Sequence, residues 1–132
     1  MNLNNEDITF VIVTHKSENI IEACLNSLPE QSKKIIVENS KNINLESSLK
    51  SKYDNIEVIL LENIGMGGSN NVGIKKCTTK YAFILNPDVK FREDTIKNLI
   101  ESLQKVDNFT IASPLNSDLN FPNYNIYSKT EK

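Results

Sequence analysis

Residues 8–14, with the sequence ITFVIVT, are an almost unbroken run of β-branched and aromatic side chains. Such a run predicts a β-strand that is covered on both faces, as in a parallel sheet. Further runs of this kind follow at residues 34–38 (KIIVE), 56–61 (IEVILL) and 81–85 (YAFIL), and a weaker one lies at residues 109–112 (FTIA). The sequence therefore predicts a sheet built from these strands.

Segments with helical periodicity separate the strands. Ser17 is predicted to cap the first of them, and residues 94–105 have the clearest amphipathic pattern. The predicted helices cover residues 18–28, 45–53, 69–76 and 94–105. Strands that alternate with helices require right-handed crossovers, which place the helices on both faces of the sheet. The predicted fold class is α/β, with a doubly wound and mostly parallel sheet.

The composition indicates one ordinary soluble globular domain. The chain has 132 residues, of which 39% are hydrophobic and 24% are charged. No second full domain fits in this length. We expect the domain to cover residues 1–115, and the Asn-, Ser- and Asp-rich residues 116–132 to form an irregular polar tail.

Charge and hydropathy disfavour several classes of function. Lys and Arg number 15 and Asp and Glu number 17, so the net charge is −2 and no nucleic-acid partner is expected. The longest apolar runs are far shorter than the roughly 20 residues that cross a bilayer, so we expect no membrane span. The polar, acidic amino end lacks the features of a secretory signal, and we expect a cytoplasmic protein.

Cysteine and histidine are too few for a structural zinc site. The two cysteines, Cys24 and Cys77, lie far apart, and His15 is the only histidine. A Ser-His-Asp triad would depend on His15, and no serine lies in a nucleophile-elbow context. We interpret both cysteines as small buried hydrophobic residues on helix faces.

Ligands of doubly wound sheets bind beyond the carboxyl ends of the strands. The search for a functional site therefore narrows to the loops at residues 14–17, 38–42, 62–71 and 86–90. Glu38, at the end of the second predicted strand, is placed to accept hydrogen bonds from a base edge or a ribose. The alternative interpretation of Glu38 is a solvent-exposed loop acid.

Three glycines precede the third predicted helix. Gly65, Gly67 and Gly68 would let the backbone approach a ligand and leave helix N–H groups free for phosphate. This stretch follows the third strand and lacks a Lys-Ser/Thr ending. It therefore matches neither a dinucleotide-binding fingerprint nor a P-loop.

Asp88 follows Asn86 and Pro87 directly after the fourth predicted strand. A carboxylate held there by a rigid proline is a good ligand for Mg²⁺ or Mn²⁺, which also bind diphosphate oxygens. The alternative is a turn aspartate that supports the local backbone. His15 could reach the same edge of the sheet, and its alternative is a polar surface or packing residue.

Four segments at these strand ends, taken together, resemble the ordered signatures of family-two glycosyltransferases. They are residues 11–15 (VIVTH), 35–40 (IIVENS), 62–73 (ENIGMGGSNNVG) and 83–89 (FILNPDV). The resemblance is to the rhamnosyltransferase-like branch and spans about residues 8–113. It implies a GT-A fold with a Rossmann-like nucleotide-binding half. It also implies inverting transfer of a sugar from a nucleotide-diphosphate donor of the UDP or dTDP type.

The resemblance also implies roles for individual residues. Glu38 falls where the family usually has an aspartate that reads the base, and Asn86 replaces the first acid of a metal-binding Asp-x-Asp element. Asp88 matches the retained acid, so the resemblance implies Mg²⁺ or Mn²⁺ bound at Asp88. The family's Asn-x-Gly…Asn-x-Gly segment is matched by Asn63, Gly65, Asn71 and Gly73. The positions implied to bind the donor are Thr14, His15, Glu38, Asn63, Gly65, Asn71 and Asn86.

No catalytic base can be assigned. An inverting transferase needs a carboxylate that deprotonates the acceptor hydroxyl, and in the family this acid lies well beyond the metal motif. The residues after Asp88 do not contain that base motif. We therefore predict the donor-binding half of a transferase, completed by further chain or by a second subunit. The apolar surface that a missing acceptor half would leave uncovered also predicts self-association into a homo-oligomer.

Two other classes of function stay open. A non-catalytic module would keep the fold and bind a protein partner, and the missing base and the lost metal acid favour it. A flavodoxin-like regulator would share the layered fold and bind FMN without a metal. Thermal stabilisation by a nucleotide with metal would indicate the transferase, and stabilisation by neither would indicate the interaction module. Stabilisation by FMN without a metal would indicate the flavodoxin-like regulator.

Overall fold

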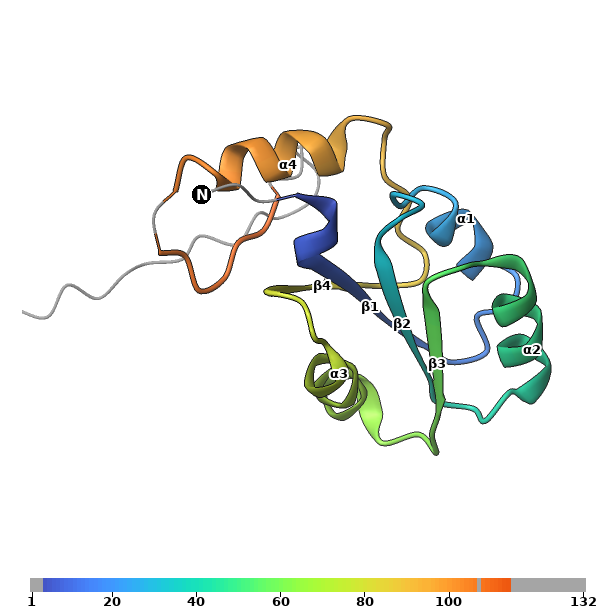
Figure 1. The fold of residues 1–132 in the computed structure, drawn as a ribbon. Coiled ribbons are helices and arrows are strands. Elements are labelled where there is room, and N and C mark those ends of the chain that lie inside the picture. Colours follow the sequence, from blue (N-terminus) through green and yellow to red (C-terminus); the bar gives the residue numbers. More distant parts are fainter. Residues whose placement is uncertain (1–3, 107, 115–132) are drawn as a thin grey trace, which may run out of the picture.

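The computed structural model describes residues 4–106 and 108–114, which form one sheet with helices around it (Figure 1). The strands are β1 (Ile8–Thr14), β2 (Lys33–Glu38), β3 (Ile56–Leu60) and β4 (Tyr81–Leu85). The helices are the 3-10 helix η1 (Asn5–Asp7) and the α-helices α1 (Ile21–Leu25), α2 (Ile43–Lys52), α3 (Gly65–Lys76) and α4 (Thr95–Leu103). All four strands are parallel, in the order β3-β2-β1-β4.

β1 lies between β2 and β4, and every one of its residues is buried. Its β-branched and aromatic sequence suits this place, because a strand with neighbours on both sides and helices on both faces meets little water. The register pairs Thr14 with Glu38 and Ile12 with Leu85. The strands therefore end along one common carboxyl edge of the sheet.

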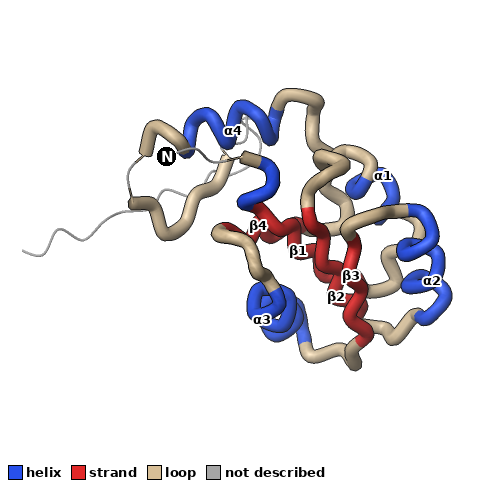
Figure 2. The backbone as a smooth tube through the Cα atoms, in the orientation of Figure 1, coloured by secondary structure: helices blue, strands red, loops and turns tan. Residues whose placement is uncertain are grey.

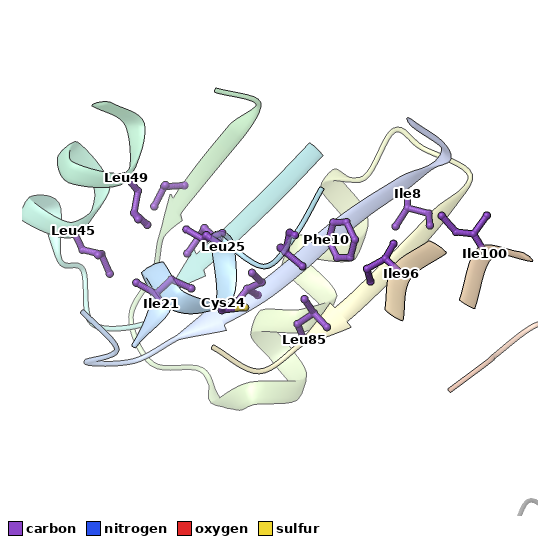
Figure 3. Packing of buried hydrophobic residues seen from close by; sticks show 14 residues of the cluster. Ile8, Phe10, Ile21, Cys24, Leu25, Leu45, Leu49, Leu85, Ile96 and Ile100 are labelled. Carbon is purple, nitrogen blue, oxygen red and sulfur yellow. The ribbon is translucent and has the colours of Figure 1, made fainter. Parts of the chain in front are cut away.

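Helices cover both faces of the sheet, and the predicted doubly wound α/β fold is confirmed (Figure 2). On one face, α1, α2 and α4 pack around Phe10 and Ile36 and form the larger core (Figure 3). On the other face, α3 packs against β1 and β2 near Ile35 and Val37. Among the described α-helices, α3 alone thus forms the layer on this face of the sheet.

The predicted fifth strand at residues 109–112 is wrong. None of these residues lies in a strand, and Ile111 is 78% exposed. The segment contacts the sheet through a side chain instead, because the Phe109 ring stacks on Tyr81 with ring centroids 5.1 Å apart. A strand needs a neighbour that bonds its main chain, and the described residues pair no segment with the outer edge of β4.

The first helix is shorter than predicted, and Ser17 does not cap it. The main-chain N–H groups of Ile20 and Ile21 both donate to the Ser17 carbonyl at 3.1 Å, so a turn precedes the helix. The Ser17 hydroxyl bonds to the main chain of His15 at 3.2 Å. α1 therefore begins at Ile21 and has no side-chain cap.

The third helix begins at Gly65, earlier than the predicted residue 69. Asn63 Oδ1 accepts a hydrogen bond from the Gly65 N–H at 3.0 Å, and Gly65 has a φ of +80° that glycine adopts without strain. Gly67 and Gly68 consequently lie inside the helix. The prediction that they form an open loop before a helix is wrong.

The predicted polar tail at residues 116–132 and the predicted domain boundary at residue 115 lie outside the described residues. Among the described helices, none is long and apolar enough to cross a membrane. The longest of the α-helices given above is α3 with 12 residues, whereas a span needs roughly 20.

The two cysteines differ in burial. Cys24 lies on α1 and is fully buried in the larger core, as predicted, whereas Cys77 follows α3 and is half-buried. Burial, and to a lesser extent the charge of Asp88, raise the pKa of the Cys24 thiol from its ordinary value of 9.0 to about 11. The core position of Cys24 therefore keeps its thiol protonated near neutral pH.

We expect Cys24 to be inert towards aromatic disulfide reagents in the folded protein. At pH 8 in metal-free buffer, about one Cys24 thiol in a thousand is ionised when its pKa is about 11, and the thiolate is the reactive form. A Cys77→Ser variant isolates Cys24, and its modification should proceed only as fast as the protein unfolds. Rapid modification of this variant in its folded state would contradict the buried position.

The same shift makes stability depend on pH. Because folding raises the pKa of Cys24, its contribution to the free energy of unfolding is complete below about pH 9 and is lost as the pH rises through about 11. Urea unfolding of Cys77→Ser, with and without an added Cys24→Ser change, should show the difference shrinking over this range. A difference that stays constant would contradict the raised pKa.

Candidate functional site

The loops that follow the strands lie along the carboxyl edge of the sheet, and side-chain contacts join three of them. Residues 39–42, which we call the central loop, follow β2 and lie between the loops after β3 and β1. The Asn42 side-chain amide donates to the Glu18 carboxylate after β1. The Lys41 ammonium pairs with the Glu62 carboxylate after β3 at 2.6 Å. The central loop therefore bridges its two neighbours.

Two buried polar residues connect the central loop to α3. Asn39 donates its main-chain N–H to the Thr14 carbonyl at 2.8 Å. The side-chain oxygen of Asn39 accepts a hydrogen bond from the Ser69 hydroxyl at 2.6 Å, and both residues are buried. This contact holds the first turns of α3 against the ends of β1 and β2.

Glu38 ends β2, and its side chain faces inward with 0% of the residue exposed. Its Oε2 accepts hydrogen bonds from the main-chain N–H groups of Ser40 at 3.0 Å and Asn42 at 2.7 Å. Its Oε1 accepts a hydrogen bond from the Ser40 hydroxyl at 2.6 Å. The alternative interpretation of Glu38 as a solvent-exposed loop acid is wrong, because the carboxylate binds its own loop.

Thr14 and His15 follow one another at the end of β1 but differ in exposure. Thr14 is 1% exposed, and its hydroxyl is buried without a hydrogen-bond partner among the described residues. A buried polar group in this state costs roughly 1–3 kcal/mol, so a ligand or a water that bonded it would be favoured. His15 is exposed, and its contacts with Ser17 are made by the main chain.

The residues around the start of α3 are largely exposed. The Asn63 side-chain oxygen is engaged by the Gly65 N–H, and Gly65 has open space around it. Asn71 is exposed further along the helix, whereas Asn70 is half-buried with a side-chain oxygen that no described residue bonds. Because α3 begins here, the first N–H groups of the helix lack partners within it.

The turn after β4 lies against α1. Cys24 Sγ is 3.8 Å from the Asn86 carbonyl oxygen, and the Asp88 charge contributes to the raised pKa of Cys24. The side chains of Asn86 and Asp88 are exposed, and no described residue forms a hydrogen bond or ion pair with the Asp88 carboxylate. β1 separates the ends of β2 and β4 by about 10 Å, so Glu38 and Asp88 do not share one cluster.

Asp88 is a single candidate metal ligand. Within residues 4–106 and 108–114, no three His, Cys, Asp or Glu side chains gather in a way that could hold a metal ion. Mg²⁺ is commonly bound by one or two carboxylates, with substrate phosphates and water as the other ligands. An exposed and unengaged Asp88 fits that pattern, although a carboxylate alone does not make a site.

A cavity of about 1020 Å³ lies away from these loops, between α1 and α4. Its walls include Leu28, Phe91 and Ile100, and among the predicted loop residues only Lys90 contributes to it. The cavity therefore does not coincide with the predicted site at the carboxyl edge.

The predicted donor-binding positions do not include Asn39 and Ser69, which the structure places at the centre of the edge. Ser69 and Gly73 are the buried residues of α3, and they lie four residues apart on the side that faces the sheet. Two small residues at helical spacing are the signal of a helix that packs closely on its neighbour. That spacing could have identified Ser69 as part of the layer beneath the site.

A sequence profile described as Glycosyl transferase family 2 matches residues 9–130 of the chain. The chain belongs to glycosyl transferase family 2. The low-salt glycan biosynthesis hexosyltransferase Agl10 of Haloferax volcanii is 27% identical to it over 114 residues. The aligned region covers 83% of this family 2 chain and 36% of Agl10.

Solved structures share the fold. The crystal structure of residues 1–349 of TarS from S. aureus has a TM-score of 0.62 and 18% identity, and the likeness covers 74% of this chain and 32% of that TarS fragment. The same TarS fragment in complex with UDP-GlcNAc also has a TM-score of 0.62, over 74% of this chain and 31% of the fragment. The family 2 chain thus spans about a third of the length of Agl10 and of the TarS fragment.

Proposed function

We propose that this family 2 chain is the donor-binding part of a glycosyltransferase, and that it binds a nucleotide-diphosphate sugar at the carboxyl edge of its sheet. The proposal rests on one observation. Three of the four segments that resemble the family end at this edge and the fourth begins there, and the central loop joins the loops on either side of it. TarS has been crystallised with UDP and with UDP-GlcNAc, which supports a donor of the UDP or dTDP type.

The proposed donor site divides between two parts of the edge. The proposed place of the base and ribose is the loop that begins with Thr14 and His15, of which His15 is exposed and Thr14 is buried with a hydroxyl that no described residue bonds. The start of α3 lies beside the diphosphate and sugar, because the helix dipole and the N–H groups that follow Gly65 in the first turn favour negative charge. The residues proposed for this second part, together with the turn after β4, are Asn63, Gly65, Asn71 and Asn86.

Asp88 is the proposed ligand of Mg²⁺ or Mn²⁺. Its carboxylate is exposed, no residue within 4–106 and 108–114 bonds it, and the uncharged Asn86 stands where the family has another acid. When bound, the ion would offset the negative charge that develops on the leaving diphosphate. The net charge of the chain is −2, and Lys41 in the central loop is paired with Glu62.

Transfer with inversion also requires a base for the acceptor hydroxyl. The family resemblance assigns no residue of this chain to that role. The chain spans about a third of its relatives, which supports a base and an acceptor site on another part of a longer protein or on a second subunit. We therefore propose that the chain binds the donor and orients it, and that transfer needs this further part.

Thermal unfolding of the full chain with added ligands tests the proposal. We expect UDP or dTDP to raise the unfolding midpoint only when Mg²⁺ or Mn²⁺ is present. A ligand at 100 times its Kd stabilises the folded state by about 2.7 kcal/mol, which is a measurable shift. No shift with any nucleotide and metal would contradict the proposal and favour a protein-interaction module. A shift with FMN alone would favour a flavodoxin-like regulator.

A further inference from the structure

The Glu38 carboxylate is bonded by the chain that follows it. It accepts three hydrogen bonds, two from main-chain N–H groups of Ser40 and Asn42 and one from the Ser40 hydroxyl. Asn42 is also the N-cap residue of α2, so the carboxylate lies at the positive end of that helix. A buried carboxylate is favourable in such surroundings, because the N–H groups and the helix dipole replace the water that it has lost.

These hydrogen bonds also hold a strained residue. Lys41 lies between Ser40 and Asn42 and has a φ of +54°, which is unfavourable for a residue with a side chain. The N–H groups on either side of Lys41 both donate to the same oxygen, Glu38 Oε2. The carboxylate is therefore the group that keeps the backbone in this turn.

The turn at Lys41 also positions the loops after β1 and β3. Lys41 reaches Glu62 after β3, Asn42 reaches Glu18 after β1, and Asn39 bonds Ser69 on α3. If the backbone at Lys41 relaxed, the contacts of Lys41 and Asn42 would move with it. The shape of the carboxyl edge thus depends on a side chain that is itself closed to solvent.

We propose that Glu38 is a positioning residue, which holds the central loop in the shape that the nucleotide needs, and that its carboxylate does not read the base. This inference rests on the proposed function. To reach a base edge, the carboxylate would give up three hydrogen bonds and release the turn at Lys41. A base edge offers one or two hydrogen bonds in return, so the exchange is unfavourable.

Two measurements on the full chain test this role. Amide hydrogen exchange at Ser40 and Asn42 reports whether the loop is held, and calorimetric affinities for UDP, dTDP and GDP with Mn²⁺ report whether the base is read. The variants are Glu38→Gln, which removes the charge, and Ser40→Ala, which removes one of the three hydrogen bonds. Ser51→Ala is the matched control, because the Ser51 hydroxyl bonds a main-chain carbonyl within α2.

We expect Glu38→Gln to speed exchange at both amides about tenfold and to weaken all three nucleoside diphosphates by a common factor of about fivefold, roughly the worth of one hydrogen bond. Ser40→Ala should act in the same direction and less strongly, and Ser51→Ala should change neither measurement. A common factor leaves the ratio of the UDP and GDP affinities unchanged. That constant ratio separates a positioning residue from one that reads the base.

Three results would overturn the inference. The first is amide exchange in Glu38→Gln that equals the wild-type rate. The second is a tenfold change in the ratio of the UDP and GDP affinities of Glu38→Gln. If Glu38→Gln does not fold, the third is a Ser40→Ala variant that behaves like Ser51→Ala. A wild-type chain that binds no nucleotide overturns the proposed function and, with it, the link to the nucleotide. In that event the exchange rates still decide whether Glu38 holds the loop, so the two failures remain distinguishable.

Discussion

Replacing Gly73 by alanine is expected to destabilise the fold by about 1–3 kcal/mol, although alanine is the better helix former. A Cβ at this position would lie 2.4 Å from Val11 Cγ1 and 3.2 Å from Val37 Cγ2, whereas carbon atoms in contact are about 3.5–4.0 Å apart. Val11 and Val37 are fully buried, and β-branched side chains have little freedom to rotate away. α3 would therefore have to lift from the sheet.

Gly67→Ala is the matched control, because Gly67 lies in the same helix and a Cβ there would meet nothing within 4 Å. We expect this change to stabilise the protein by up to about 1 kcal/mol, which is the difference in helix propensity. Urea unfolding measures both effects from the transition midpoint. Adding Val11→Ala to Gly73→Ala should recover part of the loss, because the two positions share one contact. Equal stability of the two alanine variants would contradict the close packing of α3.

The strands could be predicted because their signal is local. Every residue of β1 is buried, and consecutive β-branched and aromatic side chains in the sequence are typical of such a strand. The segment at residues 109–112 has a similar composition and forms no strand. Whether such a run becomes a strand depends on a pairing partner elsewhere in the chain, and local composition carries no information about that partner.

The start of α3 could not be predicted from helix propensity. Glycine disfavours helices, so the run from Gly65 to Gly68 indicated a loop. In the structure, Asn63 caps the Gly65 N–H, and the helix packs closely on the sheet at Ser69 and Gly73. These tertiary contacts outweigh the unfavourable propensity.

The sequence predicted on which edge of the sheet the candidate residues lie, but it did not predict the direction of their side chains. The doubly wound pattern predicted that Thr14, Glu38 and Asp88 follow or end strands on one edge of the sheet, and the structure has all three at the carboxyl ends of strands. Position alone did not reveal that Glu38 turns into its own loop. The polar residues two and four positions later, Ser40 and Asn42, are the available signal, because side-chain oxygens often accept from main-chain N–H groups at such short spacings.

Replacing Asp88 by alanine is expected to abolish the metal-dependent part of nucleotide binding. Asp88 is the proposed ligand, and Asn86, two residues earlier, carries no charge that could replace it. The described residues offer no other cluster of acids for the ion. Loss of a group that only supports a metal ligand costs roughly 10–100-fold in affinity, so loss of the ligand itself should cost at least about 100-fold. Calorimetric titration with Mn²⁺ and UDP measures the change.

Asp54→Ala is the matched control for this experiment. Asp54 is an exposed aspartate just before β3, at the opposite edge of the sheet, so the variant makes the same change in net charge far from the proposed ligand. Its titration should equal that of the wild-type chain, and Asn86→Asp, which adds a second acid beside Asp88, should strengthen the response to Mn²⁺. Nucleotide binding that responds to Mn²⁺ equally in the Asp88→Ala and Asp54→Ala variants would remove Asp88 from the site. The donor would then have to be held by the loops after β1 and β3 without a metal at the end of β4.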